Sequence, residues 1–454
     1  MNPFTNPLFL LRIAKSYISD VNRIWNTNPK KMKKYQDKAF RKIVRYAFSV
    51  PLYYDKYKEH GIHLRDINGI DDIHKLPFIS KEDLREYYPD GIIPKRFDKK
   101  HGFKISTSGS TGKPVVIYYD AFTAIKSLEG FVRILKAYGG NWRKSKIVMI
   151  IDMSPDSIEH AVFKKSTMPF LKNFLSLKNI NYIDIGEKPE NIITKLDSFN
   201  PEFIASDPYM LRELAYLKSN NFGKNIQPKY IFSGGAMLDS YTKKYVENAF
   251  NTKILDTYGT TEAGPLAFEC IHGDYYHINS DFVYLECLDE NNKPVSYGNP
   301  GHIVVTKLYG KGTPIIRYTG FDDIVTPIKN NTICGISTPL IQHIEGRCTD
   351  IFVLPDNKLI SPLTVTGIPA KVMEEFNSYK IKQFQIIQHT KSEIEVLFVI
   401  DENKRNIGIS VEKLFNEIQK RFTEKIGSDV NIIISETDEI SKKARVAISK
   451  VKQK

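Results

Sequence analysis

Residues 106–114 read Ser106-Thr107-Ser108-Gly109-Ser110-Thr111-Gly112-Lys113-Pro114, and every residue before the proline is glycine, hydroxylated or lysine. Glycines let a backbone turn tightly and approach a ligand closely. Backbone N–H groups in such a loop converge on an anion, and the hydroxyls and the Lys113 ammonium add further donors. The spacing of Gly109 and Gly112 differs from that of the G-x-x-x-x-G-K-[ST] phosphate loop. The stretch predicts a polyphosphate-binding loop, with a flexible surface turn as the alternative.

The segments that follow this loop alternate between strands and helices. Between about 104 and 260, short apolar runs have the length of buried strands, and helical periodicity fills the stretches between them. The strand-like runs are 115–119, 146–151, 182–185, 203–205, 230–232 and 253–255, and the clearest helix is 121–138. This alternation predicts an α/β fold whose mostly parallel sheet is covered by helices on both faces.

The two flanking regions have different patterns. Residues 1–100 are predicted to be mainly helical, and Ser80 with Asp83 forms the capping-box pattern of a helix start. From about 275 to 345 strands dominate, which predicts a β-rich subdomain.

After Arg347 the chain again mixes strands and helices. The strand-like runs are 384–388, 394–400 and 430–435, and 411–425 is helix-like. We expect a large N-terminal domain at 1–346 and a small α+β domain at 347–454.

The composition is that of a globular protein with an excess of positive charge. The chain has 454 residues, of which 41% are hydrophobic and 26% charged, and its net charge is +13. A net positive charge is compatible with binding to nucleic acid, anionic lipid or an anionic substrate. The lysines are scattered and no nucleic-acid motif occurs, so we expect no nucleic-acid partner. Four cysteines without a C-x-x-C pair predict a reducing, cytoplasmic environment.

The start of the chain is apolar but short. No uncharged window is long enough for a transmembrane helix, and the pattern of a signal peptide is absent. We expect an amphipathic helix packed on the protein, with peripheral contact to a membrane as the alternative. The apolar residues are Phe4, Leu8, Phe9, Leu10, Leu11 and Ile13.

Three further motifs follow the loop in chain order. Tyr258-Gly259-Thr260-Thr261-Glu262 combines an aromatic face for a base, a tight glycine, hydroxyl donors and a carboxylate that can bind a hard cation. Asp322 and Asp323 end an Arg-Tyr-Thr-Gly-Phe run and can bind ribose hydroxyls. The third motif is Glu345-Gly346-Arg347, near the expected domain boundary. Each motif is weak by itself, but their order together with the loop is specific.

Together these motifs resemble those of the adenylate-forming superfamily, which includes acyl-CoA synthetases, firefly luciferase and the adenylation domains of peptide synthetases. Within it, the chain is most similar to the phenylacetate–CoA ligase group and its CapK-like members. The residue pattern of 107–114 is similar to that of this group, as are Pro51-Leu52-Tyr53-Tyr54 and the run from Leu76 to Leu84. The resemblance covers nearly the whole chain.

The resemblance implies an AMP-forming ligase that works in two steps. A small carboxylic acid attacks the α-phosphate of ATP, which gives an acyl-adenylate and pyrophosphate, and a thiol, usually coenzyme A, then displaces AMP. Mg²⁺ is the implied metal. The identity of the acid and the oligomeric state are left open. The alternatives are transfer to an amine or hydroxyl acceptor, for example in surface-polysaccharide biosynthesis, and a non-catalytic nucleotide-binding protein.

The resemblance also implies roles for individual residues. Thr107, Ser108, Gly109, Ser110, Thr111, Gly112 and Lys113 would bind the leaving phosphates. Tyr258 would lie against adenine, Thr261 would contact the α-phosphate and Glu262 would bind Mg²⁺. Asp322 would bind ribose, with Asp323 as the alternative because Phe321 replaces a glycine. The remaining residues of the implied nucleotide site are Gly234, Gly259 and Arg347.

In this superfamily the C-terminal domain rotates between the two steps, so the resemblance implies that 347–454 is a mobile lid whose pivot would fall near Thr349 and Asp350. A catalytic lysine usually lies in a Ser-Gly-Lys-x-Arg run, which here is Ser441-Lys442-Lys443-Ala444-Arg445. Lys443 is the implied catalytic lysine and Lys442 the competing choice, and a solvated basic tail is the alternative. The chain also departs from the family at Ala236, where relatives often have glutamate.

Some family members carry a zinc site built from cysteine and histidine. Cys270, His277 and Cys334 lie at matching positions, with His272 as a candidate fourth ligand, but Thr332 replaces the first cysteine of the usual Cys-x-Cys pair. Structural zinc sites use four ligands. The alternative is a packed cluster without metal.

Overall fold

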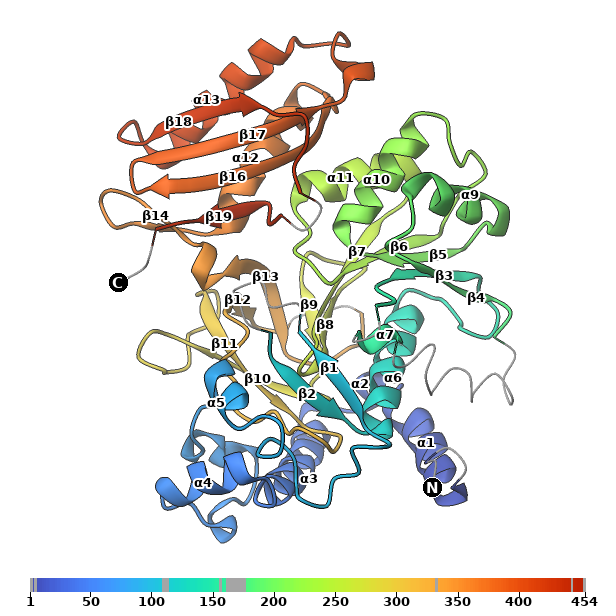
Figure 1. Cartoon of the computed structure of the whole chain (residues 1–454), viewed down its shortest axis with the longest axis vertical. Coiled ribbons are helices and arrows are strands. Elements are labelled where there is room, and N and C mark those ends of the chain that lie inside the picture. Colours follow the sequence, from blue (N-terminus) through green and yellow to red (C-terminus); the bar gives the residue numbers. More distant parts are fainter. Residues whose placement is uncertain are drawn as a thin grey trace.

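The first hundred residues form the helical region that the sequence predicts. The computed structural model describes residues 3, 6–107, 114–154, 157–160, 177–330, 334–441 and 444–451. The helices of this region are α1 (Pro7–Asp20), α2 (Arg23–Asn26), α3 (Pro29–Ala47), α4 (Pro51–Glu59) and α5 (Lys81–Glu86). Of these, α1, α3 and α4 lie at the end of the molecule opposite the C-terminal strands (Figure 1).

Prolines and capping side chains determine where several of these helices begin. Pro7, Pro29 and Pro51 occupy the first turns of α1, α3 and α4, where a missing N–H group is tolerated. Ser80 Oγ accepts the Asp83 N–H at 3.1 Å, and Asp83 Oδ2 accepts the Ser80 N–H at 2.8 Å. The predicted capping box at the start of α5 is therefore confirmed.

Five parallel strands in the order β4-β3-β5-β6-β7 form one half of the central sheet. They are β3 (Ile147–Ile151), β4 (Ile180–Asp184), β5 (Phe203–Ser206), β6 (Tyr230–Gly234) and β7 (Ile254–Thr260). Ile204 and Ile231 pack with the helices of one face, whereas Phe203 and Phe232 pack with α6 on the other. The predicted parallel sheet between two helical layers is confirmed.

The helices of these layers are amphipathic. One face of the sheet is covered by α9 (Pro189–Phe199), α10 (Pro208–Ser219) and α11 (Ser240–Phe250), and the other by α6 (Ala121–Ala137). A short helix, α7 (Ile158–His160), follows β3. Asp120, Asp207 and Asp239 cap α6, α10 and α11 by accepting a backbone N–H from the first turn, which satisfies one of the free donors at each helix start.

The direction of the strands changes after β7. On its far side β8 is antiparallel, and the order continues β8-β9-β13-β12-β11-β10 to complete eleven strands. These strands are β8 (Gly264–Glu269), β9 (Tyr276–Ile278), β10 (Val283–Leu288), β11 (Gly301–Lys307), β12 (Asp323–Ile328) and β13 (Leu340–Arg347). The β-rich region predicted near 275–345 is therefore hydrogen-bonded into the same sheet as the parallel strands, because β8 extends the edge of β7.

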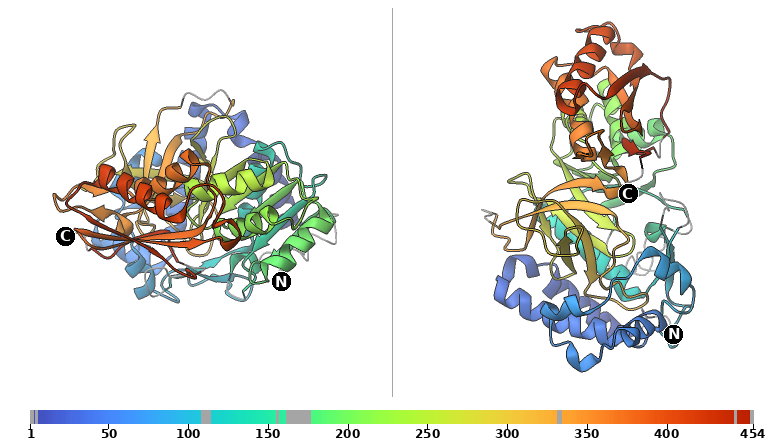
Figure 2. Two further views of the ribbon diagram at one scale, coloured as in Figure 1. Left: turned by 90° about the horizontal axis from the view of Figure 1, so that it is seen from above. Right: turned by 90° about the vertical axis from the view of Figure 1, so that its left-hand side faces the viewer.

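A separate hairpin precedes the central sheet. It consists of β1 (Phe103–Ser106) and β2 (Val116–Tyr119), which pair antiparallel from Phe103 opposite Tyr119 to Ser106 opposite Val116. In the right-hand view of Figure 2 the C-terminal strands again lie apart from the helical N-terminal end.

The last part of the chain is an α+β unit. Its four-stranded sheet has the order β18-β17-β16-β19. Its elements are β14 (Phe352–Val353), β15 (Leu359–Ile360), α12 (Pro362–Glu375), β16 (Ile381–Thr390), β17 (Glu393–Ile400), α13 (Val411–Ile426), β18 (Asn431–Glu436) and β19 (Ala447–Ser449). The domain boundary near Arg347 stays a prediction.

Aromatic contacts join this α+β unit to α11. The Tyr241 ring lies 6.1 Å from the Phe384 ring, and its hydroxyl donates to the Ile381 carbonyl. Tyr245 lies 6.2 Å from Tyr379 between ring centres. The buried side chains on both sides of this contact belong to one apolar cluster. The C-terminal unit is therefore packed against the parallel half of the central sheet in this structure.

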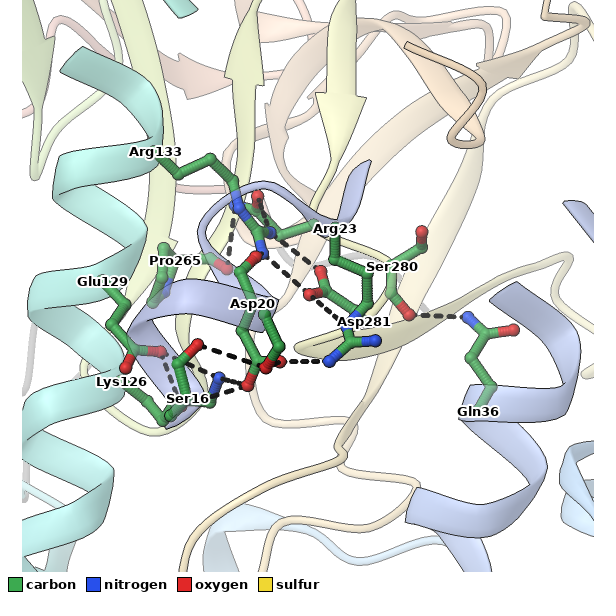
Figure 3. A network of polar contacts seen from close by, with 12 residues as sticks. Ser16, Asp20, Arg23, Gln36, Lys126, Glu129, Arg133, Pro265, Ser280 and Asp281 are labelled. Carbon is green, nitrogen blue, oxygen red and sulfur yellow. Dashed lines mark hydrogen bonds and ion pairs between the residues drawn. The ribbon is translucent and has the colours of Figure 1, made fainter. Parts of the chain in front are cut away.

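Charged side chains are buried where α1 meets α6 (Figure 3). Arg133 and Asp281 have no exposed surface, and the two guanidinium NH₂ nitrogens bind the two carboxylate oxygens at 2.8 and 2.7 Å. Lys126 of α6 pairs with Asp20 of α1 and, at 2.9 Å, with Glu129. Burial alone would raise the pKa of Asp20, but the Lys126 ammonium holds that pKa at about 2. This buried ion network fixes α1 to the body of the protein.

We expect Arg133→Met to be strongly destabilising, because it leaves the Asp281 carboxylate buried without its bidentate partner. Removal of one member of a buried ion pair costs about 3–5 kcal/mol. Urea unfolding of both proteins measures the difference. Arg143→Met, which changes an exposed arginine that stacks on Trp142, is the matched control and should change the free energy of unfolding by less than about 0.5 kcal/mol. Equal stabilities of the wild-type protein and Arg133→Met would contradict this role.

Candidate active site

Predicted nucleotide-binding residues lie at the carboxyl ends of neighbouring parallel strands. Gly234 ends β6 and is the partner of Thr257 in β7. A Cβ atom at Gly234 would lie 2.5 Å from Thr257 Oγ1, so a larger residue cannot fit there without a shift. Tyr258 and Gly259 follow within β7 itself, not in a loop after it. Open α/β sheets bind their ligands at this edge.

Thr107 closes the base of the predicted phosphate loop. Its N–H donates to the Val115 carbonyl at 2.9 Å, and its Oγ1 accepts the Val115 N–H at 3.0 Å. These bonds extend the β1–β2 hairpin by one pair. The rest of the predicted loop, namely Ser108, Gly109, Ser110, Thr111, Gly112 and Lys113, lies outside the described residues. Its phosphate contacts stay a prediction.

Glu262, the predicted Mg²⁺ ligand, is a buried carboxylate directly after β7. It is 6% exposed, and its Oε1 accepts the Tyr318 hydroxyl at 3.4 Å. Burial raises the pKa of Glu262, and the charges of Lys81 and Lys307 act in the opposite direction. Carboxylate oxygens are the ligands that hard divalent cations take. The donor chemistry at this position therefore fits the predicted metal.

Three side chains hold the turn at 261–263 by donating to its three consecutive backbone carbonyls. Tyr119 Oη donates to the first carbonyl at 2.6 Å, Lys307 Nζ to the second at 2.9 Å and Tyr309 Oη to the third at 3.2 Å. We call these three residues the carbonyl clamp. Because Tyr119 lies in β2 and Lys307 in β11, the clamp joins the predicted phosphate-loop hairpin and the antiparallel strands to the turn that carries Thr261 and Glu262.

Lys307 is the charged member of the carbonyl clamp. It is 2% exposed, and burial lowers its pKa to about 7. Its Nζ lies 4.4 Å from the centre of the Tyr119 ring and 5.9 Å from that of Tyr309, and such ring faces stabilise a cation. In its protonated form Lys307 places a positive charge close to the Glu262 backbone, in the low-dielectric interior where charges act most strongly.

Asp322, the predicted ribose ligand, forms an ion pair with a residue from the N-terminal helices. Its Oδ2 lies 2.6 Å from Lys81 Nζ of α5. The backbone of Asp322 has a φ of +58°, in the left-handed region that residues other than glycine rarely adopt. Residues held in such conformations cluster at functional sites. The ion pair brings α5 to the rim of the site.

Asp323, the alternative ribose ligand, is bound by Tyr258. The Tyr258 hydroxyl donates to Asp323 Oδ2 at 2.7 Å, and Asp323 is the strand partner of Arg347. Burial raises the pKa of Asp323 to about 6. Three predicted residues from β7, β12 and β13 thus lie together, although β7 and β12 are not neighbours in the sheet.

The two candidate catalytic lysines, Lys442 and Lys443, lie outside the described residues. Arg445, from the same run, forms an ion pair with Asp350, the residue predicted to lie at the pivot. Ala444 N–H also donates to the Ser441 carbonyl at 2.9 Å. The described ends of this run are therefore close to the predicted pivot, while the role of either lysine stays a prediction.

Cys270, His277 and Cys334 come together as the sequence predicts, with their ligand atoms all within 4.8 Å of one another. Cys334 Sγ lies 3.2 Å from His277 Nε2, and burial lowers the pKa of His277 to about 4, so that its imidazole is neutral and able to bind metal. His272, the candidate fourth ligand, is exposed and is not part of this group. Zinc binding stays a prediction.

The structure adds residues that sequence motifs did not identify, namely Lys81, Tyr119, Lys307, Tyr309 and Tyr318. Lys81 belongs to the capping-box helix and reads in sequence as an ordinary first-turn residue. Lys307 is the last residue of β11, a strand with an apolar centre in which all but one residue is buried. A lysine at the end of such a strand is the one signal that could have singled it out, because buried lysines are rare without a partner.

Known proteins resemble this chain over most of its length. Protein CapK from Staphylococcus aureus is 26% identical over 97% of this chain and 94% of its own length. A phenylacetate-coenzyme A ligase from Thermus thermophilus is 23% identical over 90% of this chain and 92% of its own length. No protein-family model matches the chain. The resemblance to CapK and the phenylacetate–CoA ligases that the motifs indicate is confirmed.

The fold is also that of a solved ligase. A crystal structure of 2-hydroxyisobutyryl-CoA ligase in the postadenylation state, in complex with R3-HIB-AMP, superposes with a TM-score of 0.77 at 19% identity, and the match covers 93% of this chain and 90% of that one. The predicted fold class, a large α/β region followed by a small α+β unit, is confirmed.

We expect Lys307→Met to weaken ATP binding about tenfold or more, because a turn that loses one of its donors no longer holds Thr261 and Glu262 in place. Titration calorimetry with Mg-ATP measures the affinity, and hydrogen exchange of the peptide at 257–265 should become faster. Lys311→Met, at an exposed lysine just beyond β11, is the control. A variant that keeps the wild-type affinity and exchange rate would show that the carbonyl clamp does not position the turn.

We expect Asp323→Asn to stabilise the protein at neutral pH. The pKa of Asp323 in the folded state is about 6, above its value of 3.8 when exposed, so the wild-type protein loses stability as the pH rises from 4 to 6. The advantage of the variant should grow from near zero at pH 4 to about 1–3 kcal/mol at pH 8. Urea unfolding across this range measures it, and a difference that does not depend on pH would contradict the assignment.

Proposed function

We propose that this protein is an ATP-dependent, AMP-forming ligase. It activates a small carboxylic acid as an acyl-adenylate, with release of pyrophosphate, and transfers the acyl group to coenzyme A. One observation carries the proposal: the turn bearing Thr261 and Glu262, the Tyr258–Asp323 pair and Asp322 lie together although they come from separate parts of the chain. Two relatives named phenylacetate-coenzyme A ligase, which match 90% and 71% of this chain, support it.

The described residues suit the adenylation step. We assign Tyr258 to the adenine side of the nucleotide and Asp322 with Asp323 to the ribose, since carboxylates accept hydrogen bonds from ribose hydroxyls. Thr261 lies beside them and would donate its hydroxyl to the α-phosphate. Lys307 adds a positive charge behind the turn. These groups position the nucleotide and stabilise the charge that develops when the acid attacks the α-phosphorus.

Glu262 is the residue that we assign to Mg²⁺. Its carboxylate is buried beside Tyr318, and the charges of two lysines lower its pKa. A divalent ion at this carboxylate would neutralise negative charge on the departing pyrophosphate. With the ion bound, the carboxylate stays ionised in spite of its burial. Lys113 and the loop around it are assigned to the same phosphates.

The acyl acceptor is assigned to coenzyme A, and the late lysine to Lys443 with Lys442 as the competing choice. The ion pair between Asp350 and Arg445 holds the described ends of this lysine run near the predicted pivot. We place the reaction in the cytoplasm, where ATP and coenzyme A are available and where thiols such as Cys270 and Cys334, which are free here, stay reduced.

We expect pyrophosphate exchange into ATP only when a suitable organic acid is present, and we expect Glu262→Gln to slow this exchange about 100-fold or more, because a neutral amide binds Mg²⁺ poorly. A screen over aryl, fatty and amino acids identifies the acid. Glu190→Gln, at an exposed position in the first turn of α9, is the control and should keep the wild-type rate.

Two results would contradict parts of this proposal. Binding of ATP without exchange for any acid of the panel would exclude adenylation. Exchange with acyl transfer to an amine or hydroxyl acceptor, but not to coenzyme A, would keep adenylation and replace the acceptor. Thioester formation measured with coenzyme A in single-turnover experiments distinguishes the second case from the proposed reaction.

A further inference from the structure

The first helix carries three apolar side chains on the face that points away from the protein, while Phe9 and Ile13 on its inward side pack against Ala121 and Ile125 of α6. Leu8, Leu11 and Ile18 are 76%, 66% and 72% exposed, and their spacing places them along one side of α1. Ser16 and Asp20, on the opposite side of the same helix, are buried. A surface helix of a globular protein normally presents polar side chains on its outward face. We call the three exposed residues the α1 stripe.

The buried ion network explains why the α1 stripe faces outward (Figure 3). Asp20 pairs with Lys126, and the Ser16 hydroxyl donates to Glu129 at 3.0 Å. Turning the helix over would bury the α1 stripe but would also leave Lys126 and Glu129 without these partners, which is costly in the interior. The outward orientation of the α1 stripe is therefore a fixed property of the folded protein.

A strongly basic loop lies next to the start of α1. Residues 95–104 read Lys-Arg-Phe-Asp-Lys-Lys-His-Gly-Phe-Lys, which is five cations and one aspartate. Lys95, Arg96 and Lys100 are exposed. Phe9 of α1 and the residues Lys95, Arg96 and Phe97 line one shared groove with a volume of about 860 Å³. The basic loop therefore lies beside the start of α1, where Leu8 of the α1 stripe directly precedes Phe9.

The carboxylates around this groove already have partners. Asp98 lies 2.6 Å from His101 Nδ1, Asp55 accepts the Tyr87 hydroxyl at 3.2 Å, and Asp120 accepts the Thr123 N–H at 2.9 Å. On α1 itself, Arg12 and Lys15 are exposed beside the α1 stripe, and the Arg12 guanidinium lies 3.6 Å from the centre of the Phe122 ring. The surface therefore combines exposed leucines with an excess of positive charge.

We propose that the α1 stripe and the loop at 95–104 dock this protein onto an anionic lipid bilayer. The leucines would lie at the level of the headgroups, and the lysines and arginines would bind the negative surface, as in other helices that lie in the plane of a membrane. A second copy of the chain is disfavoured as the occupant, because a symmetric dimer through this face would bring two basic loops together. An apolar protein partner would leave the basic loop without a complement.

The position of this surface is compatible with the proposed reaction. α1 lies at the end of the molecule opposite the C-terminal sheet (Figure 1), so that docking leaves the C-terminal unit facing away from the membrane. Among the described residues, no helix is long and apolar enough to cross a bilayer. The proposed contact is therefore one in which the protein lies on the surface, and it is independent of the identity of the acid.

Vesicle co-sedimentation of the full chain tests the proposal. We expect binding to vesicles of phosphatidylcholine with about 30% phosphatidylglycerol, at least about tenfold weaker binding to pure phosphatidylcholine, and weaker binding as salt is added, because exposed charges are screened. The combined variant Leu8→Ser, Leu11→Ser, Ile18→Ser and the combined variant Lys95→Glu, Arg96→Glu, Lys100→Glu should each reduce binding about tenfold or more.

The matched control is the combined variant Lys413→Glu, Lys420→Glu, Lys425→Glu, which makes the same change in charge on exposed lysines of α13 at the far end of the molecule. It should keep most of the wild-type binding. Thermal melting of all variants and their pyrophosphate exchange rates should equal those of the wild-type protein, since the changed residues are exposed and remote from Glu262.

Three results would overturn the proposal. These are absence of binding to anionic vesicles, equal loss of binding in the α13 control, and a dimer in light scattering that the serine variant converts to a monomer. The last result would assign the α1 stripe to a second copy of the chain. Failure of the proposed ligase reaction would leave these binding measurements unaffected, so the two proposals are tested separately.

Discussion

The turn at 261–263 faces the interior with three consecutive carbonyl groups, and each of these must find a donor because a buried backbone group without a partner destabilises the fold. Its donors come from β2 and from the end of β11. Because of this requirement, the β1–β2 hairpin, the junction of β7 with β8 and the antiparallel strands all pack around this turn. The residues that we assign to the nucleotide lie around this turn, so the architecture and the candidate site share the same constraint.

Buried charge has two different uses in this chain. In the ion network of Arg133, Asp281, Lys126 and Asp20, each charge has a close partner of opposite sign, and the network orients α1. At the candidate site the charges are less completely paired, and burial shifts the pKa of Asp323 to about 6 and that of Lys307 to about 7. Such shifted values are common where charge must serve a ligand rather than the fold.

Much of the fold could be predicted from periodicity and from local signals. The alternation of short apolar runs with helical segments predicted the parallel strands β3 to β7, and the capping box predicted the start of α5. The motifs predicted Tyr258, Thr261 and Glu262 in one segment because these residues are adjacent in the chain. Local patterns are reliable here because backbone propensity and the period of apolar residues act over a few residues.

What the sequence determined by itself is the order of the elements, the family resemblance and the residues of each motif. Only the tertiary structure decided that β8 extends β7 into one sheet. The same holds for three side-chain contacts: Tyr258 with Asp323, Lys81 with Asp322 and Lys307 with the Glu262 carbonyl. The tertiary structure also decided that α1 leaves Leu8, Leu11 and Ile18 exposed while Ser16 and Asp20 are buried. The physical reason is that these contacts join residues far apart in the chain, and their partners are chosen by packing and by the need to satisfy buried polar groups, which no local pattern records.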